Sequence, residues 1–114
     1  MTIDPADFAP GRLIDYEDGI YGLVYSEFPD FGDLFERKGL QGGGDTWHGM
    51  VVHLLEEHAP DVLESLDFDP EANMFCARSD DLNALKAVAL ILRKLEDRNV
   101  VADLVEHVDL TEYE

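Results

Sequence analysis

The stretch Leu13-Ile14-Asp15-Tyr16-Glu17-Asp18-Gly19-Ile20-Tyr21-Gly22-Leu23-Val24-Tyr25 decides the fold class, because it carries the clearest local signal in the chain. Asp18-Gly19 stands between two runs rich in β-branched and aromatic residues. Both central positions of a type I′ turn need a positive φ, which Asp and Gly tolerate. The stretch therefore predicts a β-hairpin, whose second strand is ended by Phe28-Pro29-Asp30.

The segment after the hairpin predicts two helices separated by a loop. Residues 31–38 predict a short helix that ends at Gly39, and the glycine-rich residues 39–44 predict a flexible loop. A longer helix then begins, with Asp45 or Thr46 as its cap, and continues to Pro60. Its apolar residues recur at helical spacing: Trp47, Met50, Val51, Leu54 and Leu55.

The second half of the chain predicts two more strands and two more helices. The strands are expected at 62–68 and 74–78, around a turn at 69–73. Ser79 is a suitable cap for the longest helix, and Arg98-Asn99 reads as a connection into a last helix at 100–108. This order predicts one α+β domain over residues 1–114: an antiparallel sheet of about four strands with helices packed on one face, after an irregular arm at 1–11.

The charge of the chain limits the class of partner. Eight Lys and Arg against 26 Asp and Glu leave a formal net charge of −18 and a sequence pI near 4.2. This excludes a nucleic-acid binder that works by neutralising phosphates, and it argues against docking on anionic lipid. It favours capture of a basic partner, because a surface of one sign steers oppositely charged proteins toward it.

The cysteine count and the terminal sequence indicate the compartment. A single cysteine, Cys76, cannot form an internal disulfide, so a redox role and a CxxC metal site are excluded. Residues 1–10 have neither the basic region nor the apolar region of a secretory signal. No apolar run approaches the 18 residues of a membrane span. We therefore expect a cytoplasmic protein.

Two patterns that suggest a ligand site fail when they are tested. The run Gly42-Gly43-Gly44 lacks the lysine of a P-loop, and Asp45 after it would repel a phosphate. His48, His53 and His58 follow one another at steps of five residues, which turns each ring about 140° from the last on a helix. Zinc-binding helices use spacings of three or four. No metal site is predicted, and His48 and His58 are expected on the surface.

Calcium binding and catalysis find no complete motif either. The alternating acids from Asp67 to Asn73 resemble the first ligands of an EF-hand loop, yet Ala72 stands where the motif needs glycine and Arg78 where it needs glutamate. The serines lack a GxSxG elbow, and Cys76 reads as a small residue packed in a strand. We predict no cofactor and no enzymatic activity; a small enzyme or a weak calcium binder remains a third alternative.

The first hairpin combines aromatic rings with carboxylates. Such a combination is suited to recognising Lys and Arg, and a solvated sheet face would explain it equally well. The residues concerned are Tyr16, Tyr21 and Tyr25 beside Asp15, Glu17 and Asp18.

Three segments of the chain carry a resemblance to a known family. They are Gly44-Asp45-Thr46-Trp47 before an apolar helix, Phe68-Asp69-Pro70-Glu71-Ala72-Asn73-Met74-Phe75-Cys76, and Ser79-Asp80-Asp81 at the start of the longest helix. From roughly Leu13 to Leu95 the chain resembles the immunity protein 51 family of bacterial polymorphic toxin systems. The family pattern carries an aromatic residue where Thr46 stands here.

The resemblance implies a small cytoplasmic protein without catalytic activity that protects its producer by binding a cognate toxin. The negative charge agrees with a basic toxin and with electrostatic steering. Two acidic surfaces are expected to bind it. One is the hairpin tip with Asp15, Tyr16, Glu17 and Asp18, and the other is the turn with Asp67, Asp69 and Glu71 beside Asp45.

Two alternatives remain open at this stage. Trp47 is either an anchor for the partner or a packed residue at the start of its helix. The function is either that of an immunity protein or that of an acidic regulatory or DNA-mimic adaptor that binds a basic host protein. In both cases we expect a monomer or weak homodimer with a protein partner, and neither nucleic acid nor membrane.

Overall fold

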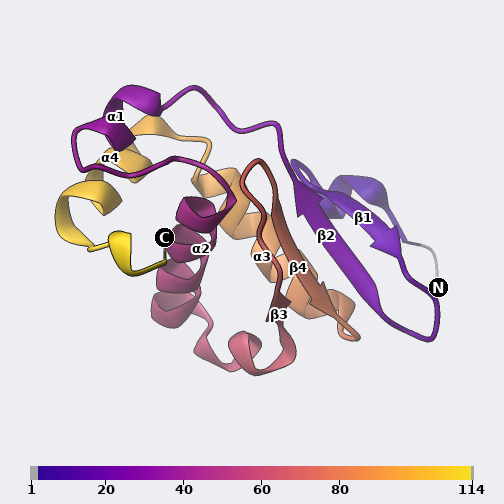
Figure 1. Ribbon diagram of the computed structural model, residues 1–114. Helices are drawn as coiled ribbons and strands as arrows, with labels where there is room; N and C mark the ends of the chain where they lie inside the picture. The colour runs from indigo at the N-terminus through magenta and orange to yellow at the C-terminus, as the bar shows by residue number, and fades with distance from the viewer. Residues whose placement is uncertain (1–2, 114) are drawn as a thin grey trace.

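The computed structural model describes residues 3–113 and centres on a four-stranded antiparallel sheet in the order β1-β2-β4-β3 (Figure 1). The strands are β1 (Arg12–Asp15), β2 (Tyr21–Tyr25), β3 (Asp67–Phe68) and β4 (Phe75–Ser79). The predicted hairpin joins β1 to β2, and Asp18 and Gly19 have φ values of 55° and 81°. The α+β class with a sheet of four strands is confirmed.

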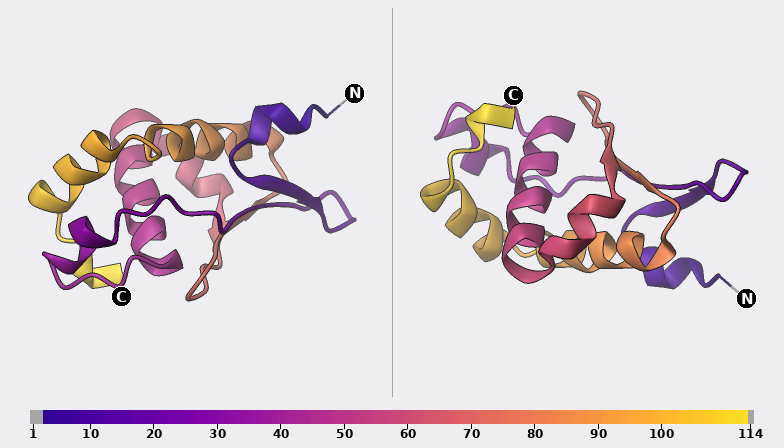
Figure 2. Two further views of the ribbon diagram at one scale, coloured as in Figure 1. Left: turned by 90° about the horizontal axis from the view of Figure 1, so that it is seen from above. Right: turned by 90° about the horizontal axis from the view of Figure 1, so that it is seen from below.

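Within residues 3–113, four α-helices and three 3-10 helices complete the fold. The α-helices are α1 (Gly32–Glu36), α2 (Gly44–His58), α3 (Leu82–Lys94) and α4 (Arg98–His107). The 3-10 helices are η1 (Pro5–Phe8), η2 (Pro60–Ser65) and η3 (Thr111–Tyr113). Helices α2 and α3 both contact β4, and α3 also contacts β2. Figure 2 shows α3 and η1 on one side of the sheet, while no described helix covers the other side.

Strand alternation divides the sheet into a core face and an uncovered face. Leu23 and Tyr25 on β2, with Phe75 and Ala77 on β4, belong to the core that the sheet forms with α2 and α3. Trp47 at the start of α2 is fully buried in this core. Val24 lies between Leu23 and Tyr25 on β2, and Cys76 lies between Phe75 and Ala77 on β4. Both side chains point to the face that carries no helix.

The starts of the helices differ from those that local sequence predicts. The cap of α3 is Asp81, whose carboxylate accepts a hydrogen bond from the amide of Asn83, because β4 continues as far as Ser79. Helix α4 begins at Arg98 with Asp97 as its cap, so Arg98-Asn99 is its first turn and not a connection. Both predicted starts were off by two residues, because Asp81 and Asp97 each accept a hydrogen bond from the amide two residues further along the chain.

Two segments also differ in type. Residues 60–65 form η2, and only Asp67–Phe68 of the predicted strand at 62–68 pairs with β4. Residues 5–8 of the arm expected to be irregular form η1, which Asp4 caps and whose Phe8 is buried. Arg93 of α3 holds η1 in place by donating from Nε to the carbonyl of Ala9 and from Nη2 to that of Ala6, each at 2.7 Å.

Over residues 3–113, the structure contains no helix of the length and apolar character that crossing a membrane requires.

Candidate protein-interaction surface

The uncovered face of the sheet is the candidate interaction surface, and we call it the outer face. One row of residues crosses all four strands on it, because Ile14 pairs with Gly22, Gly22 with Arg78, and Arg78 with Asp67. The side chains that define the outer face are Ile14, Tyr16, Ile20, Asp67, Asp69 and Arg78. In Figure 1 the viewer looks onto the sheet with α3 behind it.

Three apolar side chains stand exposed on the hairpin side of the outer face. Ile14, Tyr16 and Ile20 are 36%, 45% and 40% exposed, and they make up three of the five exposed large hydrophobic residues in the described part of the chain. Exposed apolar side chains that gather on one face mark interaction sites more often than single ones do. The outer face therefore has an apolar centre.

Tyr16 lies flat over the middle of the sheet. A Cβ atom placed on Gly22 would come within 2.4 Å of the Tyr16 ring, so the absence of a side chain at Gly22 makes room for the ring. The ring extends toward Cys76, whose thiol lies near the Tyr16 hydroxyl. Desolvation is the main cause that raises the pKa of the Tyr16 hydroxyl, and the nearby Cys76 thiol raises this pKa further.

Charged groups occupy the β3–β4 side of the outer face. Arg78 Nη2 lies 3.4 Å from a carboxylate oxygen of Asp67 and 3.4 Å from one of Asp69. The charge of Asp69 also acts on the Tyr16 hydroxyl. The Tyr16 ring lies over Gly22, whose neighbour on β4 is Arg78, so it extends from the hairpin toward the charged side of the outer face.

The turn after β3 is fixed by the glycine-rich segment. Glu71 and Met74 exchange two backbone hydrogen bonds that close the turn. The amide of Gly44 donates to the carbonyl of Ala72, and a Cβ atom on Gly43 would lie 2.1 Å from that same carbonyl oxygen. The glycines therefore allow two backbones to approach closely, and the flexible loop expected from the sequence is instead packed against the turn.

The start of α2 also differs from the sequence prediction. Gly43 is the cap residue and makes no side-chain cap bond, so neither Asp45 nor Thr46 caps this helix. The Thr46 hydroxyl, fully buried, accepts a hydrogen bond from the amide of Gly42. Because α2 starts at Gly44, these two residues lie inside its first turn.

Besides Tyr16, Asp67 and Asp69 on the outer face, the predicted partner-binding residues differ in how exposed they are. Asp15, Glu17 and Asp18 are exposed at the hairpin tip, where Asp15 Oδ1 accepts from the amide of Glu17 at 2.8 Å, and Glu71 is exposed on the turn. Asp45 is half-buried in the first turn of α2, next to Gly44, which contacts the β3–β4 turn. Trp47 has no exposed surface, which favours the packed residue over the partner anchor.

Trp47 is buried because it is part of an aromatic cluster. Phe28 stacks on it at a centroid distance of 5.0 Å, and Tyr25 meets it edge-on at 5.5 Å. Burial raises the pKa of the Tyr25 hydroxyl to about 12. This cluster stabilises the junction between β2 and α2, with Trp47 and Tyr25 buried in it.

The ring of His48 contributes to packing between α2, β3 and η3. His48, expected on the surface, is half-buried, with its ring 4.6 Å from that of Phe68 and 5.5 Å from that of Tyr113. Burial lowers the pKa of His48, and the charge of Asp45 opposes this. Within residues 3–113 no three His, Cys, Asp or Glu side chains are grouped in a way that could hold a metal ion.

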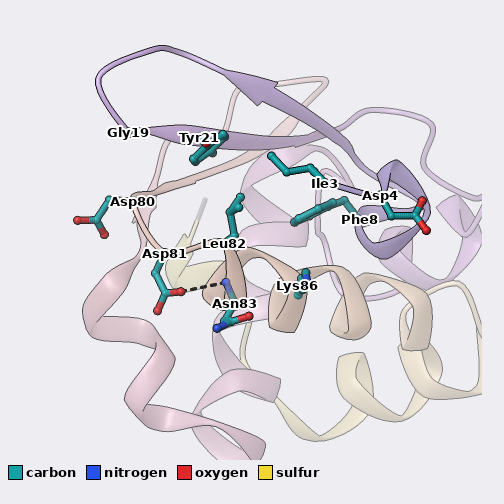
Figure 3. A pocket seen from close by; sticks show the side chains of 10 residues that line it. All are labelled: Ile3, Asp4, Phe8, Gly19, Tyr21, Asp80, Asp81, Leu82, Asn83 and Lys86. Atoms are coloured by element: carbon teal, nitrogen blue, oxygen red, sulfur yellow. Dashed lines mark hydrogen bonds between the residues drawn. The ribbon is translucent and has the colours of Figure 1, made fainter. Parts of the chain in front are cut away.

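A groove of about 590 Å³ lies beside the hairpin tip on the helical side of the sheet (Figure 3). Phe8, Tyr21 and Leu82 give it apolar walls. Its carboxylates are Asp4 and Asp81, which cap η1 and α3, and Asp80. The groove extends the acidic surroundings of the tip, and a long basic side chain has the chemistry to enter it.

Sequence reasoning missed Ile14, Ile20 and Arg78 as members of the outer face. Strand alternation contains the signal for Ile14, because Leu13 points into the core and its neighbour must then point away. The position of Arg78 between two aspartates depends on the β3–β4 register, which the sequence does not reveal.

Comparison with known proteins identifies one family. A family model described as Immunity protein 51 matches residues 12–110. Searches of curated proteins and of solved structures found no significant match.

Proposed function

Because the chain belongs to the immunity protein 51 family, we propose that it is an antitoxin that binds a cognate toxin domain and blocks it without catalysis. The proposed partner is a basic toxin domain, and the proposed binding surface is the outer face with the hairpin tip. We further propose that the protein acts in the cytoplasm, as a monomer or weak homodimer, without nucleic acid, membrane or cofactor.

The observation that carries the proposal is the composition of the outer face. Three exposed apolar side chains lie between acids at the hairpin tip and acids on the turn after β3. Protein interfaces commonly have an apolar centre that supplies most of the binding energy and a polar rim that sets the orientation. The outer face offers both parts on one surface.

The charge supports a basic partner. With a formal net charge of −18, the chain attracts positive surfaces over long distances and repels most acidic proteins. Toxins that act on nucleic acid need lysine and arginine to bind their substrate. Carboxylates of the outer face that pair with those side chains would deny the toxin its substrate.

The direct test uses the purified chain and the C-terminal domain of a toxin encoded beside it. Binding and toxin activity are measured for the wild type and for Asp67→Asn combined with Asp69→Asn. The matched control is Glu36→Gln combined with Glu56→Gln, which changes the charge equally on the exposed surfaces of α1 and α2. We expect the first pair to weaken binding by about tenfold or more and the control pair by less than about threefold.

The outcomes separate the alternatives. Inhibition of the toxin in a one-to-one complex supports the antitoxin function. Equal weakening by both pairs would mean that only net charge matters and would remove the outer face as the binding surface. Failure to bind the toxin, with capture of unrelated basic proteins that salt removes, would favour the acidic adaptor.

A further inference from the structure

Among the described residues 3–113, strand β1 forms a free edge of the sheet. The order β1-β2-β4-β3 leaves β1 with one neighbour, and the amide of Tyr16 donates to the carbonyl of Ile20 across the hairpin. Bonded pairs alternate along an antiparallel ladder, so Ile14–Gly22 is also a bonded pair. The amides and carbonyls of Leu13 and Asp15 therefore point away from β2, to the open side.

The edge is only partly protected. Natural proteins protect edge strands by keeping them short, by charged side chains, by proline or a bulge, or by covering them. Strand β1 has four residues and carries Arg12 and Asp15, but it contains neither lysine nor proline, and within residues 3–113 no backbone partner is found for the outward groups of Leu13 and Asp15. Helix η1 is bound to α3 through Arg93 and lies on the same side of β1 as α3 does (Figure 2, left).

Resting on the proposed function, we propose that a strand of the toxin domain pairs with the free edge of β1 and continues the sheet. Each partner residue in register with Leu13 or Asp15 forms main-chain hydrogen bonds there. Because side chains alternate along a strand, every second partner side chain then lies on the outer face beside Ile14 and Tyr16. One docking geometry thus uses both the edge and the apolar centre.

The charge at the edge selects the occupant. Asp15, Glu17 and Asp18 surround one end of β1 and the exposed Arg12 stands at the other, so the acidic end attracts a strand that carries lysine or arginine there. A second copy of this chain brings its own charge of −18 and the same acidic tip, and the two copies repel. The edge therefore fits a basic strand of a partner better than it fits β1 of a second copy.

Amide hydrogen exchange tests the pairing residue by residue. In the free chain the amides of Leu13 and Asp15 should exchange rapidly, whereas that of Ile14 is already protected by β2. With the toxin domain bound, we expect exchange at Leu13 and Asp15 to slow by at least tenfold and exchange at Ile14 to change less. Unchanged exchange at both residues in a formed complex overturns the proposal.

A pair of variants gives an independent readout. Asp15→Pro removes the outward amide, while Asp15→Ala removes the same carboxylate and keeps the amide. We expect Asp15→Pro to bind the toxin about tenfold more weakly than Asp15→Ala, which corresponds to one lost hydrogen bond. Circular dichroism confirms that both variants are folded, and equal affinities overturn the proposal.

The remaining outcomes distinguish the two proposals. If the wild-type chain does not bind the toxin, the antitoxin function itself fails. If it binds while Leu13 and Asp15 stay unprotected, the function stands and the strand pairing is wrong. Protection of both amides in the toxin-free chain, with a doubled mass in sedimentation, would assign the edge to a second copy.

Discussion

The amide of Gly44 donates a hydrogen bond to the carbonyl of Ala72 across 3.2 Å, and this contact joins the first residue of α2 to the tip of the β3–β4 turn. Two of the segments that resemble the immunity protein 51 family therefore touch each other in the fold. The contact holds the acidic turn at a fixed place beside the outer face.

Gly44→Ala should destabilise the protein strongly. The new Cβ would lie 2.0 Å from the Glu71 carbonyl oxygen and 2.2 Å from that of Met74, and neither backbone can move freely. We expect a loss of about 2–3 kcal/mol in the free energy of unfolding, measured with urea. In the control Gly32→Ala the nearest atom is at 3.6 Å, so its stability should change by less than about 1 kcal/mol.

Gly22→Ala should displace Tyr16 and leave the fold intact. The clash falls on the end of an exposed ring, which can swing away at little cost in stability, below about 1 kcal/mol. Because the hydroxyl then returns to water, its pKa should fall toward the ordinary value near 10. Ultraviolet titration, with Tyr16→Phe to identify the signal, measures the shift. An unchanged titration would place the ring elsewhere.

Arg93→Met should release η1. The substitution keeps most of the apolar stem and removes two charge-assisted hydrogen bonds to the carbonyls of Ala6 and Ala9. We expect a loss of about 1–2 kcal/mol and faster proteolysis before residue 12. Lys94→Met is the control, since it removes the same charge from an exposed neighbour. Equal effects of the two variants would contradict the anchoring role.

Stability should rise with pH through the titration of His48. Burial lowers the pKa of His48 in the folded state, so the unfolded chain binds a proton more readily between its own pKa near 6.5 and the folded value. The contribution of the neutral ring is therefore complete above pH 7 and is lost as the pH falls below about 6.5. Urea unfolding from pH 7 to 5 should show a smaller loss for His48→Gln than for the wild type, and equal losses for the two proteins would contradict this role of His48.

Association with a basic toxin domain should slow strongly as salt is added. The Debye length falls from about 30 Å at 0.01 M to about 3 Å at 1 M ionic strength, which removes long-range steering. Stopped-flow measurements should show the association rate falling by about tenfold or more. A rate that ignores salt would remove the steering mechanism, while family membership would be unaffected.

Local signals in the sequence were sufficient for some elements. The Asp18-Gly19 turn, the strand predicted at 74–78 and the amphipathic α3 follow from turn chemistry and apolar spacing, and each is present in the structure, the strand at Phe75–Ser79. Residues 60–65 were harder, because Val62, Leu63 and Leu66 suit a strand or a helical turn and Pro60 starts the latter. The N-terminal Asp4-Pro5 pair was a readable cap signal for η1.

The composition of the candidate site depended on long-range pairing. The acids of the hairpin tip and the turn could be named from composition, but the approach of the Tyr16 ring to the charged side of the outer face requires β2 and β4 to be neighbours. The burial of Trp47 likewise follows from Phe28 and Tyr25, which reach it from another element. A single sequence does not specify such contacts.

The attachment of η1 to Arg93 has a consequence for synthesis. Ala9 and Ala6 precede Arg93 by 84 and 87 residues, so these carbonyls leave the ribosome long before the guanidinium that binds them. At about 5–20 residues per second the interval is about 4–17 s. During this time η1 has no helix to dock on. The β1–β2 hairpin likewise has no neighbouring strand until β4 is synthesised. The N-terminal elements therefore emerge first but can pack into the fold only after β4 and α3 have emerged.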